Sequence, residues 1–173
     1  MSTETTNLLN NVDLDAVAAL TAAVANDPAA GNTTWGAEVT WQGGFSSSAR
    51  IRGFTDLRSD EPPALGGTDS APNPVEQLLA ALGNCLAVGY AANATARGIE
   101  LTDLRIKVTG DLDLHSFLGL RPGHAGFQGI NASVHLESNA APDQISDLHN
   151  AVIGSSPVGH TLQSAIPVQI HLA

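Results

Sequence analysis

The sequence predicts an α+β fold with a mostly antiparallel sheet. Segments whose apolar residues alternate with a period of two flank one long apolar helical segment at 74–97. The elements run helix, strands, long helix, two strands, helix, strand, and this order lacks the regular strand–helix alternation of parallel sheets. A chain of 173 residues is long enough for one well-buried domain.

Composition narrows the class of protein. Hydrophobic residues make up 43% and charged residues 14%, against about 25% charged in an ordinary globular protein, so we expect a folded chain. The net charge of −10 repels nucleic acid and anionic membranes. The apolar run Leu78–Ala92 is shorter than the roughly 20 residues of a membrane span, and Met1–Asn10 has no basic residue of a secretory signal. We therefore expect a soluble cytoplasmic protein without nucleic-acid or membrane partners.

Residues 1–33 are predicted to form a helical extension and linker, followed by one domain at 34–173. Asp27-Pro28 ends the helix, because the residue before proline avoids the helical conformation. We expect the helix to pack on the domain through its apolar face. That face repeats at steps of three and four: Leu9, Val12, Ala16, Ala19, Leu20 and Val24.

Alternation from Thr34 to Leu57 predicts a β-hairpin or a short meander, with a turn at Gly43-Gly44. It would place Arg50 and Arg52 on one face of the second strand. Residues 58–74 are rich in Pro, Gly and Asp and are predicted to form a loop. Irregular segments of this length inside a compact domain are often functional.

The helix at 74–97 has the strongest start signal in the chain. Asn73 is a good N-cap, Pro74 fits the first helical position, and Glu76 completes a capping box. The helix is apolar on nearly every side, and one small domain cannot bury it completely. We therefore predict a homodimer whose interface includes this helix, with Leu82 in that interface.

The C-terminal half is predicted to contain two strands, a helix and a last strand. Alternation indicates strands at 104–114 and 127–136, and a helix begins near Pro142. Ser156 followed by Pro157 is a typical helix start, in which the hydroxyl accepts a hydrogen bond from an amide two or three residues on. The last strand is predicted from four alternating residues: Ile166, Val168, Ile170 and Leu172.

Cys85 is the only cysteine, so it cannot form an intrachain disulfide. Two interpretations are open: a buried residue that behaves as a small hydrophobe, and a nucleophilic thiolate. Cys85 lies about three turns into its helix, so a thiolate there needs an arginine or another donor from elsewhere. The six histidines have no recognisable ligand spacing, so we expect no metal and no other cofactor.

Two segments together resemble the OsmC/Ohr family, the osmotically inducible protein C and organic hydroperoxide resistance proteins. The resemblance covers roughly residues 35–172 and implies an intertwined α+β homodimer with antiparallel sheets wrapped around long central helices. It also implies a thiol peroxidase whose first cysteine matches Cys85. The matching residues are Asp60-Glu61-Pro62, Gly66-Gly67-Thr68-Asp69 and Pro72–Leu86, then Ser156-Pro157-Val158 and Thr161-Leu162, with Gly126–Ile130 between them.

The sequence departs from the peroxidase pattern that this resemblance implies. A resolving cysteine would stand at Ser156, and a glutamate would stand at Val75. Glu76, the next residue, lies about 100° further round the helix and fits a cap better than a catalytic acid. An arginine holds the thiolate in such peroxidases, and no hairpin arginine aligns with it uniquely.

Arg50 and Arg52 are our candidates for that arginine. We predict that one of them lies within hydrogen-bond reach of Cys85, in the same chain or across the dimer. We also assign Glu76, Ser156 and His160 to the substrate pocket. Ser156 is expected to act only as a helix cap, so its loss should leave the reactivity of Cys85 unchanged.

Two functions from different classes follow from these residues. The first is an OsmC-like redox protein that reduces organic hydroperoxides with Cys85 and is recycled by an external thiol. The alternative is a dimeric protein without peroxidase activity that binds a small apolar or electrophilic compound.

Overall fold

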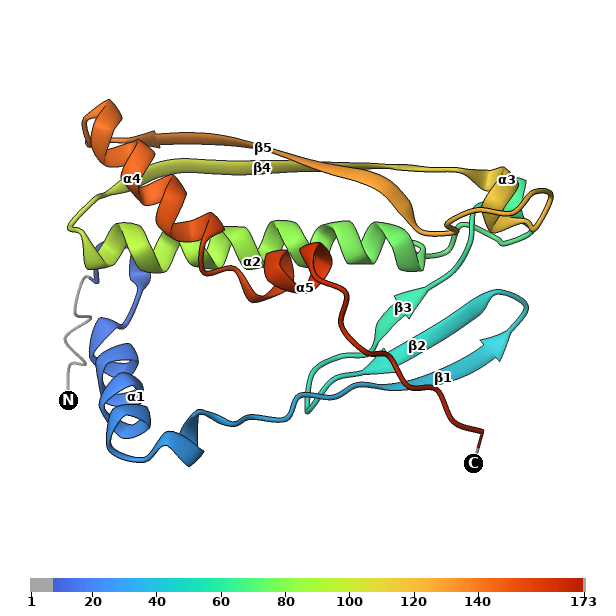
Figure 1. Cartoon of the computed structure of the whole chain (residues 1–173), viewed down its shortest axis with the longest axis horizontal. Helices are drawn as coiled ribbons and strands as arrows, with labels where there is room; N and C mark the ends of the chain where they lie inside the picture. Colours follow the sequence, from blue (N-terminus) through green and yellow to red (C-terminus); the bar gives the residue numbers. More distant parts are fainter. Residues whose placement is uncertain (1–7, 173) are drawn as a thin grey trace, which may run out of the picture. The chain divides into compact units, whose positions relative to one another are not determined.

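A computed structural model describes residues 8–172 and confirms the α+β class (Figure 1). The described residues form five α-helices and two antiparallel sheets. The chain divides into two compact units. One comprises the residues up to Asp15 together with those from Leu79 onward, and the other is Ala16–Leu78.

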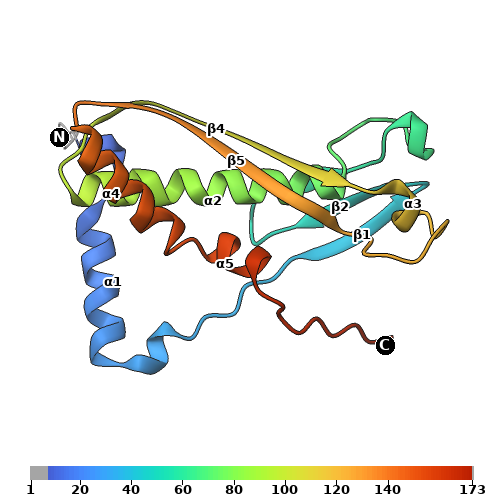
Figure 2. The same ribbon diagram turned by 45° about the horizontal axis from the view of Figure 1, so that its top comes forward.

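The larger unit is built on helix α2 (Pro74–Ala96) and the hairpin of β4 (Leu101–Leu112) and β5 (Phe127–Ser138). The two strands are antiparallel along their whole length, from the pair Leu101 and Ser138 to the pair Leu112 and Phe127. Figures 1 and 2 show the hairpin lying along α2. The predicted pair of strands is confirmed, and each begins or ends a few residues from its expected bounds.

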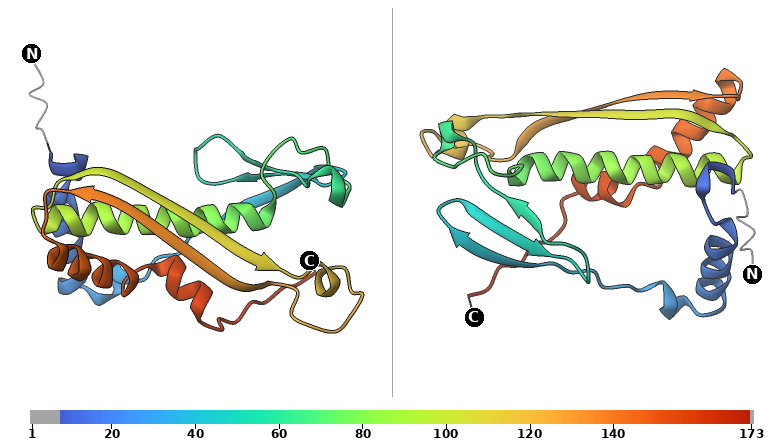
Figure 3. Two further views of the ribbon diagram at one scale, coloured as in Figure 1. Left: turned by 90° about the horizontal axis from the view of Figure 1, so that it is seen from above. Right: turned by 180° about the vertical axis from the view of Figure 1, so that it is seen from behind.

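Two helices follow the hairpin, α4 (Pro142–Ile153) and α5 (Pro157–Gln163). Both begin with proline, as predicted, and Figure 3 shows them beside the hairpin. Leu148 and Val152 of α4 are fully enclosed against α2. The core of this unit consists of Leu82, Leu86, Tyr90, Ala94, Ile99, Leu148 and Val152.

The two faces of α2 differ in burial. Residues at steps of four, from Leu82 to Ala94, face the hairpin and α4. Leu82 therefore belongs to the core of its own chain, and its predicted place in a dimer interface stays a prediction. On another face, Ala81 and Val88 are exposed, Val88 by 70%.

The length and apolar composition of α2 would also suffice to cross a membrane. Core helices of soluble proteins pass the same test. One face of α2 packs against β4, β5 and α4, as in a core helix.

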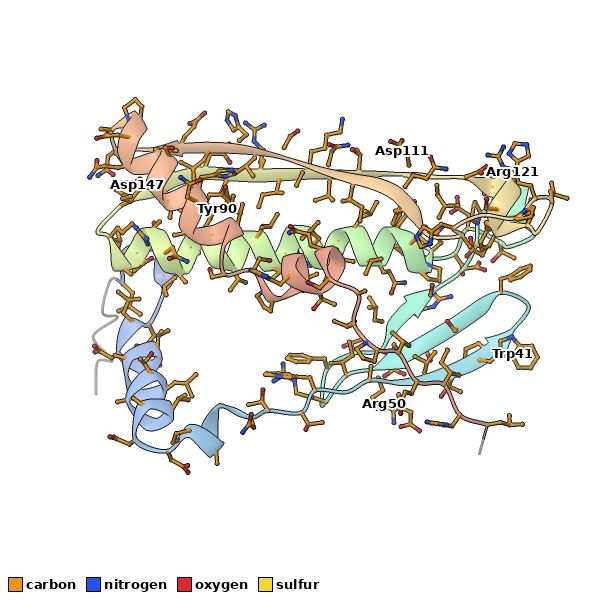
Figure 4. All side chains as sticks on the ribbon, in the orientation of Figure 1. Trp41, Arg50, Tyr90, Asp111, Arg121 and Asp147 are labelled. Carbon is orange, nitrogen blue, oxygen red and sulfur yellow. The ribbon has the colours of Figure 1, made fainter. Side chains whose placement is uncertain are left out.

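The connection between β4 and β5 contains a short helix, α3 (Leu114–Phe117), which begins at the last residue of the predicted strand. Asp113 caps this helix by accepting a hydrogen bond from the amide of His115. Arg121, at the α3 end of the hairpin in Figure 4, also donates to Asp113. The Arg121 guanidinium and the His115 ring hold the pKa of Asp113 well below its usual range.

The smaller unit contains the predicted hairpin, formed by β1 (Glu38–Gly43) and β2 (Ser46–Arg50). Gly43 and Gly44 take φ values of 102° and 57°, which suit glycine. A third strand, β3 (Leu57–Ser59), pairs with β2, so the segment forms the short meander that was the alternative to a hairpin. The strand extends two residues into the segment 58–74, which was predicted as a loop.

The N-terminal helix α1 (Leu14–Asn26) ends before Asp27-Pro28, as predicted. Within the described residues α1 has no buried residue and Leu20 is 64% exposed, so its expected packing on the domain stays a prediction. The division into an extension at 1–33 and a domain at 34–173 stays a prediction.

The predicted last strand is also wrong. Residues 164–172 have no regular secondary structure, and Ile170 is 90% exposed. A strand needs a hydrogen-bonded neighbour, and none of the described strands pairs with this segment. The alternation of Ile166 to Leu172 is real, but it has no partner within the described chain.

Candidate active site

Cys85 lies midway along α2 and is half-buried. Its sulfur is 3.3 Å from the hydroxyl oxygen of Ser156, 71 residues away in the sequence. Both residues belong to the larger unit. The structure therefore joins the two positions where the family resemblance places a cysteine pair.

Ser156 is the N-cap of α5, as predicted. Its hydroxyl oxygen accepts a hydrogen bond of 3.1 Å from the amide of Gly159. The residue is only 5% exposed, which is unusual for a cap. The same oxygen also contacts the thiol of Cys85.

A cavity of about 420 Å³ opens beside this contact. Ser156 and Gly159 belong to its wall, together with the amide side chains of Gln128 and Gln163. Cys85 is not part of the wall, and Ser156 is the wall residue that its sulfur contacts. The remaining wall is largely apolar: Leu82, Leu86, Phe127, Gly129, Ile130, Ala132, Ile153 and Leu162.

His160 is not among the residues that line this cavity, and its predicted place in a substrate pocket stays a prediction. Its ring nitrogen Nε2 is 3.0 Å from the carbonyl oxygen of Gly154, and the side chain is exposed. The four-residue step from Ser156 places His160 near the same end of α5 but turns its ring back toward the end of α4.

Glu76 completes the predicted capping box at the start of α2. Its carboxylate accepts a hydrogen bond from the amide of Asn73, and its own amide donates to the Asn73 side chain, both at 2.9 Å. The capping interpretation is confirmed, and the carboxylate is engaged there.

The candidate arginines lie in the smaller unit. Arg50 pairs with Asp56 at 3.3 Å on the surface, and this carboxylate raises the pKa of Arg50. Arg52 follows the end of β2 with a φ of 52°, and its guanidinium lies 4.7 Å from the ring centre of Phe54. Alternation predicted that the two arginines share one face of the strand. They do not, because β2 ends at Arg50. Their predicted contact with Cys85 stays a prediction.

Asp60 is a buried carboxylate that the sequence analysis noted only as part of a motif. It is 2% exposed and accepts five hydrogen bonds, from the amides of Glu61, Thr68 and Ser70 and from the hydroxyls of Thr68 and Ser70. These donors hold the pKa of Asp60 well below its usual range. A Cβ on Gly67 would lie 1.8 Å from the carbonyl oxygen of Glu61, so the closed loop requires glycine there. This arrangement orders the loop that leads to Asn73.

Tyr90 and His149 form a second polar pair that the sequence analysis missed. The Tyr90 hydroxyl hydrogen-bonds to Nδ1 of His149, so that α2 and α4 are linked where Figure 4 labels Tyr90. Burial raises the pKa of Tyr90. Both residues border a cavity of about 440 Å³ between α4 and β5. Apolar periodicity identified their neighbours but gave no signal for this pair.

One cluster on the hairpin could supply metal ligands. Asp103, His135 and Glu137 bring their ligand atoms within 4.8 Å of one another. His135 and Glu137 are exposed, Asp103 is partly buried, and Arg105 donates to Asp103 at 2.8 Å. The cluster depends on the register of β4 and β5, so spacing along the sequence could not reveal it.

The family comparison extends over most of the larger unit. Residues 67–171 match the OsmC family, described as OsmC-like protein. The chain belongs to the OsmC-like family. A comparison with curated protein sequences found no match.

Solved structures show that the fold, too, is that of OsmC-like proteins. The OsmC-like protein from Mycoplasma pneumoniae is 21% identical, with a TM-score of 0.65, over 76% of this chain and 89% of that one. An organic hydroperoxide resistance protein OsmC from Legionella pneumophila is 19% identical, with a TM-score of 0.59, over 76% and 92%. An organic hydroperoxide resistance protein from Elizabethkingia anophelis is 16% identical, with a TM-score of 0.56, over 76% and 91%.

Proposed function

We propose that this OsmC-like protein reduces organic hydroperoxides, with Cys85 as its only reactive thiol. The observation that carries the proposal is the 3.3 Å contact between the Cys85 sulfur and Ser156, a wall residue of a largely apolar cavity. Structural relatives named organic hydroperoxide resistance proteins support the choice of substrate. The apolar wall favours an organic hydroperoxide over hydrogen peroxide.

The proposed reaction uses two kinds of reactant. The Cys85 thiolate attacks the outer peroxide oxygen, the O–O bond breaks, and the departing alkoxide takes a proton to give an alcohol. Cys85 is left as a sulfenic acid. An external thiol then displaces hydroxide, which leaves as water, and forms a mixed disulfide. A second external thiol releases the Cys85 thiol and an external disulfide.

External thiol is required because Ser156 cannot form a disulfide and the chain has no other cysteine. A supply of small thiols is characteristic of the cytoplasm, where thiols stay reduced. We therefore place the protein in the cytoplasm.

We also propose that the protein acts as an intertwined homodimer. The exposed apolar face of α2, which includes Ala81 and Val88, supports this, since a second copy would remove it from water. The alternating segment from Ile166 to Leu172, which has no strand partner among the described residues, supports an exchange of strands.

The test of the reaction is consumption of cumene hydroperoxide by the purified protein with dithiothreitol as the thiol. We expect turnover that requires the thiol, exceeds turnover of hydrogen peroxide, and disappears in Cys85→Ser. Equal consumption by wild type and Cys85→Ser would contradict the proposal. Tight binding of the hydroperoxide without turnover would favour the alternative, a binding protein.

Val88→Asp tests the dimer. Val88 is 70% exposed in the single chain, so a charge there leaves the core intact but opposes association. We expect light scattering to show a dimer for the wild type and a folded monomer for the variant. Ala96→Asp, at an exposed position near the end of the same helix, is the control. A monomeric wild type at micromolar concentration would contradict the dimer.

A further inference from the structure

We propose that Ser156 is a positioning residue that favours the thiolate of Cys85 by donating its hydroxyl hydrogen to the sulfur. The inference rests on the proposed function only in taking Cys85 as the reactive group. It reverses the expectation from the sequence that Ser156 is a cap without influence on the thiol.

The direction of the hydrogen bond follows from the donors around the hydroxyl. The amide of Gly159 donates to the Ser156 oxygen at 3.1 Å and occupies one of its lone pairs. The hydroxyl hydrogen is thus free for an acceptor, and the Cys85 sulfur lies 3.3 Å away. An amide, a hydroxyl and a sulfur form a chain in which each donor points toward the thiolate, and such chains strengthen one another.

Burial makes this contact more important to the thiol than a surface contact would be. Ser156 is only 5% exposed, so water can do little to replace either of its hydrogen bonds. If the thiol were the donor, the hydroxyl hydrogen would lack an acceptor among the described residues, which is costly in a buried site. When Cys85 is ionised, the Gly159 amide, the Ser156 hydroxyl and the Cys85 sulfur all have a hydrogen-bonding partner.

The contact supplies the donor that the middle of α2 lacks. Sequence reasoning required an arginine for this role. Among residues 8–172, the hydrogen-bonding partner of the Cys85 sulfur is Ser156. The core residues Leu148 and Val152 fix the end of α4, three residues before Ser156 begins α5, so the hydroxyl is held by the fold.

Gly159 leaves room for this arrangement. A Cβ at that position would lie 3.0 Å from the Ser156 hydroxyl oxygen and 3.1 Å from its Cβ. Alanine at 159 would therefore displace the hydroxyl by a few tenths of an ångström while keeping serine at 156. This offers a way to disturb the contact without removing the donor.

The test is the rate of Cys85 alkylation by iodoacetamide between pH 5 and pH 10. In Ser156→Ala we expect the midpoint of the pH–rate profile to rise by about one pH unit, since a hydrogen bond to a charged group is worth about a tenfold change in the ionisation equilibrium. The thiolate without its donor is intrinsically more nucleophilic, by about threefold. The two profiles should therefore cross, with the variant about threefold slower at low pH and faster at high pH.

Three further variants separate the hydrogen bond from the cap. Ser156→Asp keeps a good cap but replaces the donor by a carboxylate, so its midpoint should rise at least as far as that of Ser156→Ala. Ser156→Thr keeps both the cap and the hydroxyl and should restore the wild-type profile. Gly159→Ala should move the midpoint in the same direction by a smaller amount. Circular dichroism checks that each variant is folded.

The outcomes distinguish this inference from the proposed function. Crossing profiles in the alanine and aspartate variants, with rescue by threonine, support Ser156 as the donor, whether or not hydroperoxide is consumed. Superimposed profiles in folded Ser156→Asp and Gly159→Ala overturn it, even if hydroperoxide turnover is normal. If Ser156→Ala does not fold, these last two variants decide.

Discussion

Two helix starts in this protein share one local design and differ in what surrounds them. Asn73-Pro74 begins α2, and Ser156-Pro157 begins α5. In each, the side chain before the proline accepts a hydrogen bond from the amide three residues on, at 2.9 Å for Asn73 and 3.1 Å for Ser156. The first cap closes on Glu76 near the surface, whereas the second is buried against a thiol. The same local motif thus serves only the helix in one place and contacts the sulfur of Cys85 in the other.

The supports of the two caps also differ. A polar loop centred on the buried carboxylate of Asp60 leads to Asn73. An apolar core that includes Leu148 and Val152 precedes Ser156. Substitutions in the core should therefore affect the cap at Ser156, and substitutions of the Asp60 carboxylate should affect the cap at Asn73.

The largest effect is expected from Leu148→Ala, which removes a fully enclosed side chain beneath the second cap. We expect a loss of about 2–5 kcal/mol in the free energy of unfolding, because transfer and cavity costs add. Urea denaturation measures this loss. Asp147→Ala, one residue earlier on the exposed side of α4, should change stability by less than about 0.5 kcal/mol. Similar losses in both variants would contradict the assignment of this core.

Asp60→Asn breaks the support of the first cap. The native pKa of Asp60 is lowered, so its contribution to stability is present above the unfolded value of about 3.9 and is lost as the pH falls below it. We expect the variant to be less stable than wild type at pH 7 and the difference to shrink at pH 3. Urea denaturation at both pH values checks this, with the exposed Asp69→Asn in the same loop as control. A difference that grows in acid would contradict the sign.

Asn73→Ala tests whether the two caps differ in their effect on the thiol of Cys85. We expect a loss of about 1 kcal/mol, the usual cost of a missing N-cap, and an unchanged pH profile of Cys85 alkylation. Ser156→Ala should cost a similar amount and move that profile. If removal of Asn73 moved the profile equally, the special role of the second cap would be wrong.

The smallest effect is expected from Glu76→Gln. Glutamine can still complete the capping box but loses the favourable charge at the start of α2, so we expect a cost of about 0.3–0.5 kcal/mol. Thermal unfolding at low and high salt measures it, and the cost should shrink at high salt. Turnover of hydroperoxide should not change, because the carboxylate serves the cap. A large loss of turnover would instead indicate a catalytic acid.

Some features of the site followed from the sequence, and others depended on pairing and burial. The caps at Asn73 and Ser156 could be predicted because a proline and a polar side chain act within one helical turn. The pair of Tyr90 and His149 could not, because it requires α2 and α4 to pack in one register. The irregular segment after α5 was misjudged for a related reason, since alternation does not show whether a hydrogen-bonding neighbour exists.

The sequence by itself determined the α+β class, the start of each major helix and the one cysteine that is available as a candidate nucleophile. These depend on local propensity, apolar periodicity and residue chemistry, all of which act over a few neighbouring residues. Only the tertiary structure decided that Leu82 belongs to the core of its own chain and that Ser156 meets Cys85 across 71 residues. The physical reason is that packing decides which side chains are buried and which residues distant in sequence touch. Packing therefore places the cap of α5 against the thiol of Cys85.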